Sequence, residues 1–85
     1  MRLKRMLVVE NELGLHARPA AELSKIAARF KADIVLCGNG LSANANSILS
    51  LLMLGAAKGT TLTVTADGVD ALDALSAIRK SLCLS

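Results

Sequence analysis

The segment from residue 33 to residue 44 constrains the fold more than any other part of the sequence. Asp33–Cys37 (DIVLC) and Leu41–Asn44 (LSAN) are both predicted to be short strands, and residues 38–40 (GNG) separate them. Glycine and asparagine tolerate the positive φ angles of tight hairpin turns. Because a hairpin makes its two strands antiparallel, this segment excludes an all-parallel sheet of βαβ units.

The rest of the chain predicts two more strands and three helices. One strand is expected at Lys4–Glu10, which is rich in apolar residues. Another is expected at Thr61–Ala66, where apolar residues alternate with threonines. Helices are expected at Arg18–Phe30, at Ser47–Leu54 and from Asp70 toward the end of the chain.

The spacing of apolar residues defines the face that each long helix is expected to bury. In the first helix, the apolar residues three and four positions apart are Leu23, Ile26, Ala27 and Phe30. In the last helix, the residues expected on the buried face are Leu72, Leu75, Ile78 and Leu82. An acidic start at Asp70 and Asp73, with Arg79 and Lys80 near the end, suits the dipole of this last helix.

The predicted order of elements is βαββαβα, with turn-forming residues 11–15 (NELGL) ahead of the first helix. A four-stranded antiparallel sheet with helices on one face is the economical solution, so we expect an α+β fold. The chain of 85 residues has room for one small core, and we expect a single domain over residues 1–85.

Composition limits both the core and the partners. Hydrophobic residues make up 53% of the chain, but Phe30 is the only aromatic residue, so aliphatic side chains must fill the core. The net charge is +3, and the basic residues are spread over the start, middle and end of the sequence. Clustered basic residues and exposed aromatic rings are typical of nucleic-acid binding, so we expect no nucleic-acid partner.

The two cysteines, Cys37 and Cys83, have neither a CxxC arrangement nor metal-ligand spacing. We therefore expect no metal site, and a reducing, cytoplasmic environment. The longest nearly apolar stretch, Ile48–Ala57, contains Ser50 and Gly55 and is too short to span a bilayer. We expect a soluble protein without membrane insertion.

The segment Gly14–Ala20 (GLHARPA) contains the only histidine, His16, at the predicted start of the first helix. Helix N-termini present unpaired backbone N–H groups and a partial positive charge, which together attract anions. Histidine titrates near neutral pH, so its imidazole is available as a nucleophile. Arg18 adds a planar donor for a phosphate oxygen, and Pro19 fits the first helical turn. A phosphoryl group on the imidazole would lie among the N–H groups of Ala17 and Arg18.

Other interpretations of this segment stay open. A lone histidine is more often a helix cap or a surface residue than a nucleophile, and a lone arginine is more often solvated. The chain could thus be a scaffold module in which His16 is an incidental cap. We expect Gly14 to let a partner protein approach closely. No second ligand, base or carboxylate pair accompanies His16, which argues against a hydrolytic or metal enzyme.

Two motifs resemble those of the HPr family, the histidine phosphocarriers of the bacterial phosphoenolpyruvate-dependent phosphotransferase system. Gly14–Ala20 is similar to the active-site signature of the family. Asn46–Gly59 (NSILSLLMLGAAKG) resembles its second signature. The resemblance covers essentially the whole chain, with the same order of elements.

The resemblance implies an open-faced β-sandwich, in which four antiparallel strands carry three helices on one side. It implies that enzyme I, charged by phosphoenolpyruvate, phosphorylates His16 on Nδ1, and that the group then passes to a histidine of an enzyme IIA domain. Ala17 and Arg18 would bind the phosphate, and Arg18 would assist in stabilising charge. Such a protein is a stoichiometric carrier rather than an enzyme. We expect it to be a monomer that needs no cofactor.

The predicted helix Ser47–Leu54 (SILSLLML) is apolar nearly all round, although a short helix turns only one stripe toward the core. We expect Leu51 and Leu54 in the core and Ser47 as the helix cap. The residues expected to remain partly exposed, as a surface on which partner proteins dock, are Ile48, Leu49, Leu52 and Met53.

The resemblance also implies regulation. In HPr of Gram-positive type, an ATP-dependent HPr kinase/phosphorylase modifies the serine that matches Ser47, and this inhibits transfer from enzyme I. Asn46-Ser47, followed by Leu-Leu-Met-Leu, resembles the nitrogen-related paralogue NPr. The resemblance therefore implies a carrier that serves sugar uptake or its regulation. The alternative is a non-catalytic regulatory or interaction module of the same fold, of nitrogen type or regulated by serine phosphorylation.

Overall fold

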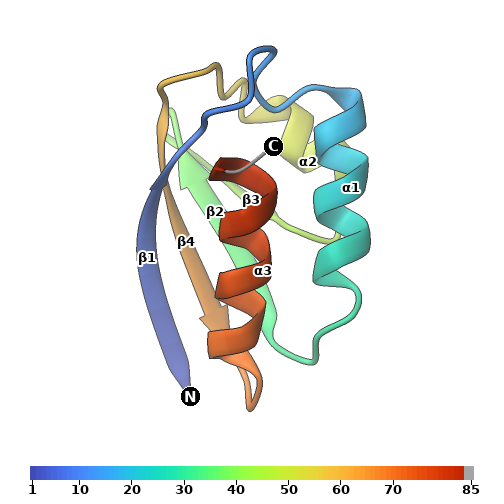
Figure 1. Ribbon diagram of the computed structural model, residues 1–85, viewed down its shortest axis with the longest axis vertical. Helices are drawn as coiled ribbons and strands as arrows, with labels where there is room; N and C mark the ends of the chain where they lie inside the picture. The colour runs from blue at the N-terminus through green and yellow to red at the C-terminus, as the bar shows by residue number, and fades with distance from the viewer. Residues whose placement is uncertain (84–85) are drawn as a thin grey trace.

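Strand β4 (Thr61–Asp67) organises the sheet, because it hydrogen-bonds to a strand on each of its sides. The computed structural model describes residues 1–83. Its other elements, in chain order, are β1 (Arg2–Val8), α1 (Ala17–Ala27), β2 (Asp33–Gly38), β3 (Leu41–Asn44), α2 (Ile48–Met53) and α3 (Ala71–Cys83). The strand order is β1-β4-β2-β3, and every neighbouring pair is antiparallel (Figure 1).

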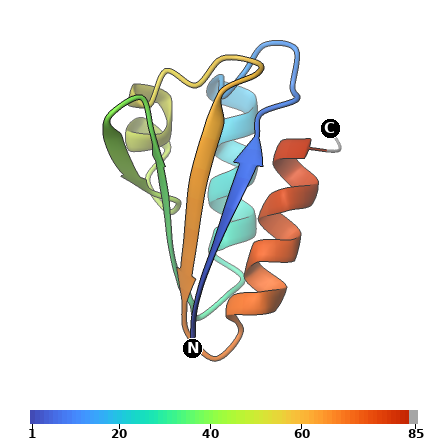
Figure 2. The ribbon, with the colours of Figure 1, turned by 90° about the vertical axis from the view of Figure 1, so that its left-hand side faces the viewer.

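All three helices cover the same face of the sheet. In Figure 2 the strands lie nearer the viewer and the helices lie behind them. Helix α3 packs on β1 and β4, α1 contacts both α3 and α2, and α2 packs on β3. The predicted α+β fold, an open-faced sandwich of four antiparallel strands and three helices, is confirmed.

The core is aliphatic, as the composition predicts. In β4 the side chains of Leu62, Val64 and Ala66 are fully buried, and the threonines between them are not. The largest fully buried side chains are Leu23, Ile34, Leu36, Leu51, Leu54, Leu62, Ile78, Val9 and Val64. The aromatic ring of Phe30 packs only at the margin of this core, where it is partly buried.

The β2–β3 hairpin turns at two residues with positive φ. Asn39 has a φ of 51° and Gly40 a φ of 77°, as a two-residue type I′ turn requires. The Asn39 side-chain amide also donates to the Leu54 carbonyl at 2.8 Å, which ties the tip of the hairpin to the end of α2. The turn predicted at residues 38–40 is confirmed.

The first strand begins and ends two residues earlier than the sequence predicts. Strand β1 pairs with β4 along its whole length, and the ladder ends at Val8 opposite Thr61. Beyond the ladder, the Glu10 N–H donates to the Leu82 carbonyl near the end of α3, at 3.1 Å. The predicted bounds Lys4–Glu10 are therefore wrong, because the apolar pattern continues past the last residue that β4 can pair.

Helix α1 ends three residues before the predicted end at Phe30. The N–H groups of Arg29 and Phe30 donate to the carbonyls of Ile26 and Ala27, three residues back rather than four. Such bonds tighten the last turn and close the helix. The predicted bounds Arg18–Phe30 extend too far, because Phe30 reaches the core without helical backbone.

Helix α3 buries a face slightly different from the predicted one. Leu72 is 60% exposed, whereas the other three predicted residues are buried. Six positions separate Leu72 from Ile78, which leaves their side chains roughly 120° apart around the helix. Ala71 and Ala74 occupy the buried face in its place. Apolar spacing missed them because alanine alone is a weak signal of burial.

The carboxylate of Asp70 joins the start of α3 to the loop before β2. It accepts hydrogen bonds from the backbone N–H of Lys31 at 2.8 Å and of Ala32 at 2.9 Å. The bond from Lys31 is the main cause that lowers the pKa of Asp70 below its ordinary value of 3.8. The sequence predicts an acidic helix start at this residue, but the side chain binds the neighbouring loop.

We expect Asp70→Asn to destabilise the protein at neutral pH but not in acid. The pKa of Asp70 is near 3.8 in the unfolded chain and lower in the folded chain. The ionised carboxylate therefore stabilises the fold above pH 3.8, and this contribution is lost as the pH falls through the folded pKa. Urea unfolding should show a lower midpoint for the variant at neutral pH, and a difference that disappears near pH 2.

Asp73→Asn is the matched control. Asp73 is an exposed carboxylate in the first turn of the same helix, so its loss removes the same charge from the same pole. We expect a smaller shift of the urea midpoint in this variant. Equal shifts in the two variants would assign the effect to the helix dipole and not to the loop contact.

Candidate functional site

His16 occupies the N-cap position of α1. Its backbone is extended, with φ −85° and ψ −179°, and its carbonyl accepts the first helical hydrogen bond from Ala20 at 2.8 Å. The side chain is exposed, and the imidazole makes no capping hydrogen bond. The ring is therefore available to react, although the residue sits where a cap would.

The start of α1 offers an anion two unpaired donors. Since Ala20 makes the first helical bond, the N–H groups of Ala17 and Arg18 have no backbone acceptor within residues 1–83, and Pro19 has no N–H. No acidic side chain lies in the first turn. The partial positive charge of the helix start is thus not compensated locally.

Arg18 is an exposed residue in this first turn. Over the part of the chain that the structure describes, the one ion pair joins Lys58 Nζ to Glu12 Oε1 at 2.8 Å, so no carboxylate neutralises the Arg18 guanidinium. The structure brings His16, Ala17 and Arg18 together at one helix start, as the sequence predicts.

The backbone before His16 is held by the segment that follows α2. Leu15 is buried, and its N–H donates to the Ala56 carbonyl at 2.8 Å. Gly14 has a φ of 70°, and a Cβ built there would lie 2.5 Å from the Ala56 oxygen and 2.9 Å from the Ala57 Cα. Only glycine fits between these two stretches of backbone.

This packing corrects the expected role of Gly14. From the sequence, Gly14 is expected to let a partner protein approach, but the space that a Cβ would take is filled by the backbone of Ala56 and Ala57. The glycine is required for an internal contact that fixes the backbone entering α1. The sequence alone could not reveal this, because residues 14 and 56 are far apart along the chain.

A hollow of about 330 Å³ borders the imidazole of His16. The other lining residues come from two segments, Leu13 and Leu15 before α1, and Leu52 with residues 55–57 at and beyond the end of α2. Leu13 was expected only to lie within a turn. A large leucine in a segment of turn-forming residues is the one signal in the sequence that could have singled it out.

Helix α2 exposes an apolar surface next to this hollow. Leu51 and Leu54 are buried, as predicted. The exposed apolar residues of the helix, which we call the α2 surface, are Ile48, Leu49, Leu52 and Met53. Their exposure agrees with the expectation, and their role in docking stays a prediction.

Ser47 caps α2, as predicted. Its Oγ accepts a hydrogen bond from the Ser50 N–H at 3.3 Å and donates one to the Ser50 Oγ at 3.0 Å. The side chain is half-buried. Capping therefore accounts for the residue, and phosphorylation of Ser47 stays a prediction.

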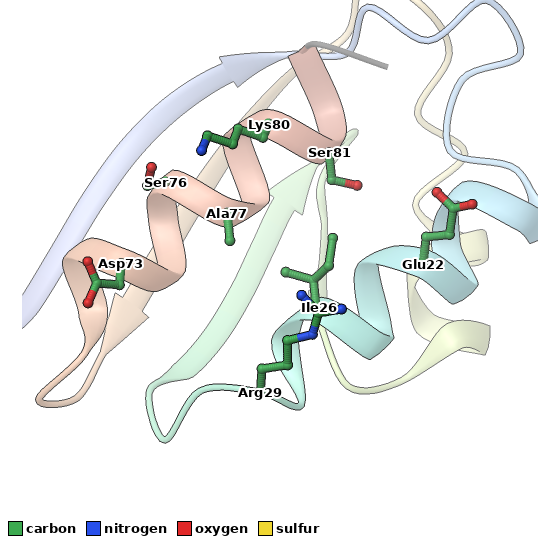
Figure 3. A pocket seen from close by; sticks show the side chains of 8 residues that line it. All are labelled: Glu22, Ile26, Arg29, Asp73, Ser76, Ala77, Lys80 and Ser81. Atoms are coloured by element: carbon green, nitrogen blue, oxygen red, sulfur yellow. The ribbon is translucent and has the colours of Figure 1, made fainter.

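A larger hollow, of about 600 Å³, lies elsewhere, between α1 and α3 (Figure 3). Ile26 and Ala77 contribute its apolar lining. Side chains of both charges surround them, namely Glu22, Arg29, Asp73 and Lys80. It contains no histidine or cysteine, so the smaller hollow beside His16 is the better candidate for chemistry.

Neither Cys37 nor Cys83 lines the hollow beside His16. Burial raises the pKa of the Cys83 thiol, and its Sγ donates to the Val8 carbonyl at 3.3 Å. The Cys37 Sγ lies 3.3 Å from the Ser42 Oγ.

Within residues 1–83, no cluster of three His, Cys, Asp or Glu side chains could hold a metal ion. None of the helices in this range has the length and apolar character needed to cross a membrane.

Comparison with known proteins gives consistent matches. The family described as "PTS HPr component phosphorylation site" matches residues 3–82. The phosphocarrier protein HPr of Vibrio cholerae is 43% identical over 72 residues, which cover 85% of each chain. That of Neisseria meningitidis serogroup A is 38% identical over 76 residues, covering 89% of this chain and 85% of its own. The crystal structure of HPr from Bacillus anthracis superposes with a TM-score of 0.91 at 36% identity, over 95% of this chain and 96% of that one.

We expect Gly14→Ala to lower the free energy of unfolding more than Gly40→Ala does. Both glycines have positive φ, and the strain of an alanine there costs about 1–3 kcal/mol. Nothing lies within 4 Å of a Cβ at Gly40, whereas a Cβ at Gly14 would overlap the backbone of Ala56 and Ala57. Urea denaturation measures the free energy of unfolding of the two variants. Equal losses of this free energy would mean that the backbone of Ala56 and Ala57 moves aside without an energetic cost.

Proposed function

The chain belongs to the HPr family of phosphocarrier proteins of the phosphotransferase system, and on this basis we propose that it accepts a phosphoryl group from phospho-enzyme I on His16 and donates it to enzyme IIA domains. The observation that carries the proposal is the exposed imidazole at the N-cap of α1, free of any capping bond. It stands beside the unpaired N–H groups of Ala17 and Arg18.

The proposed reaction is a transfer in which one bond to phosphorus replaces another. The neutral imidazole attacks through the Nδ1 lone pair, and the bond between phosphorus and the donor breaks as the bond to Nδ1 forms. Transfer to the enzyme IIA histidine repeats the step with His16 as the leaving group. The oxygens of the phosphoryl group carry negative charge throughout, so the helix start and Arg18 stabilise each stage.

A small domain suffices for such a step, since phosphoryl transfer depends mostly on positioning and electrostatic stabilisation. The chain itself turns over no substrate, because each arriving phosphoryl group leaves on a second protein. We propose a stoichiometric carrier that works in the cytoplasm, in sugar uptake or in its regulation. The α2 surface next to His16 would form part of the contact with both partners.

The test is intact-mass spectrometry after incubation with enzyme I, magnesium and phosphoenolpyruvate at neutral to alkaline pH. We expect the wild-type chain to gain one phosphoryl group, which acid treatment removes. His16→Ala should gain none, while circular dichroism shows that it is folded. No gain by folded wild-type protein with its cognate enzyme I would favour the alternative, a regulatory or interaction module of the same fold.

We expect Arg18→Ala to slow the phosphorylation of His16 by roughly 10- to 100-fold, through loss of one charged donor to the transferring group. Arg18→Lys should fall between this variant and the wild type, because it keeps the charge but not the planar pair of donors. The measurement is the time course of phosphoryl gain at limiting enzyme I.

Arg29→Ala is the control for a general change in net charge. Arg29 is an exposed arginine just beyond the opposite end of α1. If Arg29→Ala slows the reaction as much as Arg18→Ala does, the effect is long-range steering of the partner rather than contact with the phosphoryl group.

A further inference from the structure

Leu13 has a large, apolar and exposed side chain, and it lines the same hollow as His16. It is 72% exposed, and it lies outside the α2 surface. Single exposed leucines occur on every protein surface, so exposure alone decides nothing. What sets Leu13 apart is the combination of a fixed backbone and a shared hollow with the candidate nucleophile.

Hydrogen bonds fix the turn that carries Leu13. The Leu13 N–H donates to the Asn11 Oδ1 at 3.2 Å, and the Gly14 N–H donates to the Asn11 carbonyl at 2.9 Å. Glu12 pairs with Lys58, at 2.8 Å, on the segment beyond α2. The Leu13 side chain thus projects from a restrained backbone, so binding through it loses little backbone entropy.

Leu13, His16 and Leu52 all line the hollow of about 330 Å³. It has room for an apolar side chain from another protein. Because His16 lines the hollow, a protein whose reactive atom reaches His16 must lie over the hollow. This favours a side chain of the protein that exchanges the phosphoryl group as the occupant.

We propose that Leu13 is a specificity-determining contact for the phosphoryl-donating protein, which inserts an apolar side chain between Leu13 and Leu52. The inference rests on the proposed function and extends it. Leu13 adds an apolar contact from the segment before α1 to those of the α2 surface, which comes from a distant part of the chain. Apolar contact with both segments excludes water from the phosphoryl group during transfer.

The test compares transfer from phospho-enzyme I to Leu13→Asn and to Leu72→Asn. Leu72 is the matched control, since it is a leucine of similar exposure, 60%, on α3 and outside the hollow. We expect Leu13→Asn to raise KM about tenfold with little change in kcat, as loss of a buried interface contact does. Leu72→Asn should stay near the wild type, and Leu13→Met, which keeps the apolar volume, should recover most of the affinity.

Phosphoramidate, a small donor that needs no protein contact, separates docking from chemistry. We expect it to phosphorylate His16 in Leu13→Asn at the wild-type rate. A slower reaction would show that Leu13 acts by positioning the imidazole, and would overturn the proposal. Equal KM values for Leu13→Asn and Leu72→Asn would overturn it as well. A wild-type chain that enzyme I never phosphorylates would instead refute the proposed function.

Discussion

The close approach of Gly14 to the backbone of Ala56 and Ala57 sets the geometry on which the candidate site depends. The hydrogen bond from Leu15 to the Ala56 carbonyl, at 2.8 Å, adds a second attachment at the same place. Because residues 55–57 follow α2 directly, these contacts fix the start of α1 relative to the α2 surface. The imidazole and the apolar surface come from distant parts of the sequence, and backbone packing makes them one face.

That face is open to solvent, which suits the proposed transfer between two proteins. A nucleophile in a deep pocket would be closed to a partner's active site, whereas His16 stands exposed at the end of a helix. In the proposed transfer, the backbone N–H groups of Ala17 and Arg18 and the Arg18 guanidinium bind the phosphoryl oxygens. We propose that the donor and acceptor proteins complete the transfer centre by excluding water, using the exposed apolar residues near His16 as their contact surface.

The features of the fold and the site that depend on a few neighbouring residues were predictable from the sequence. The GNG hairpin, the alternation in β4 and the position of His16 ahead of Pro19 each depend on a few neighbouring residues. Contacts between distant residues were missed, including the internal role of Gly14 and the loop bound by Asp70. Leu72 was misplaced because small alanines at two positions define the buried face of α3.

The contacts of Asp70 and those of Gly14 and Leu15 lie at opposite ends of the sheet and differ in their effect on the candidate site. Asp70 joins α3 to the loop before β2 at the end opposite the start of α1 (Figure 1). Contacts at that end stabilise the fold without shaping the site, whereas the contacts of Gly14 and Leu15 do both. A change in transfer rate therefore reports on docking or chemistry only when stability is unchanged. Exposed residues such as Leu13 and Arg18 meet that condition, because their side chains take no part in the core.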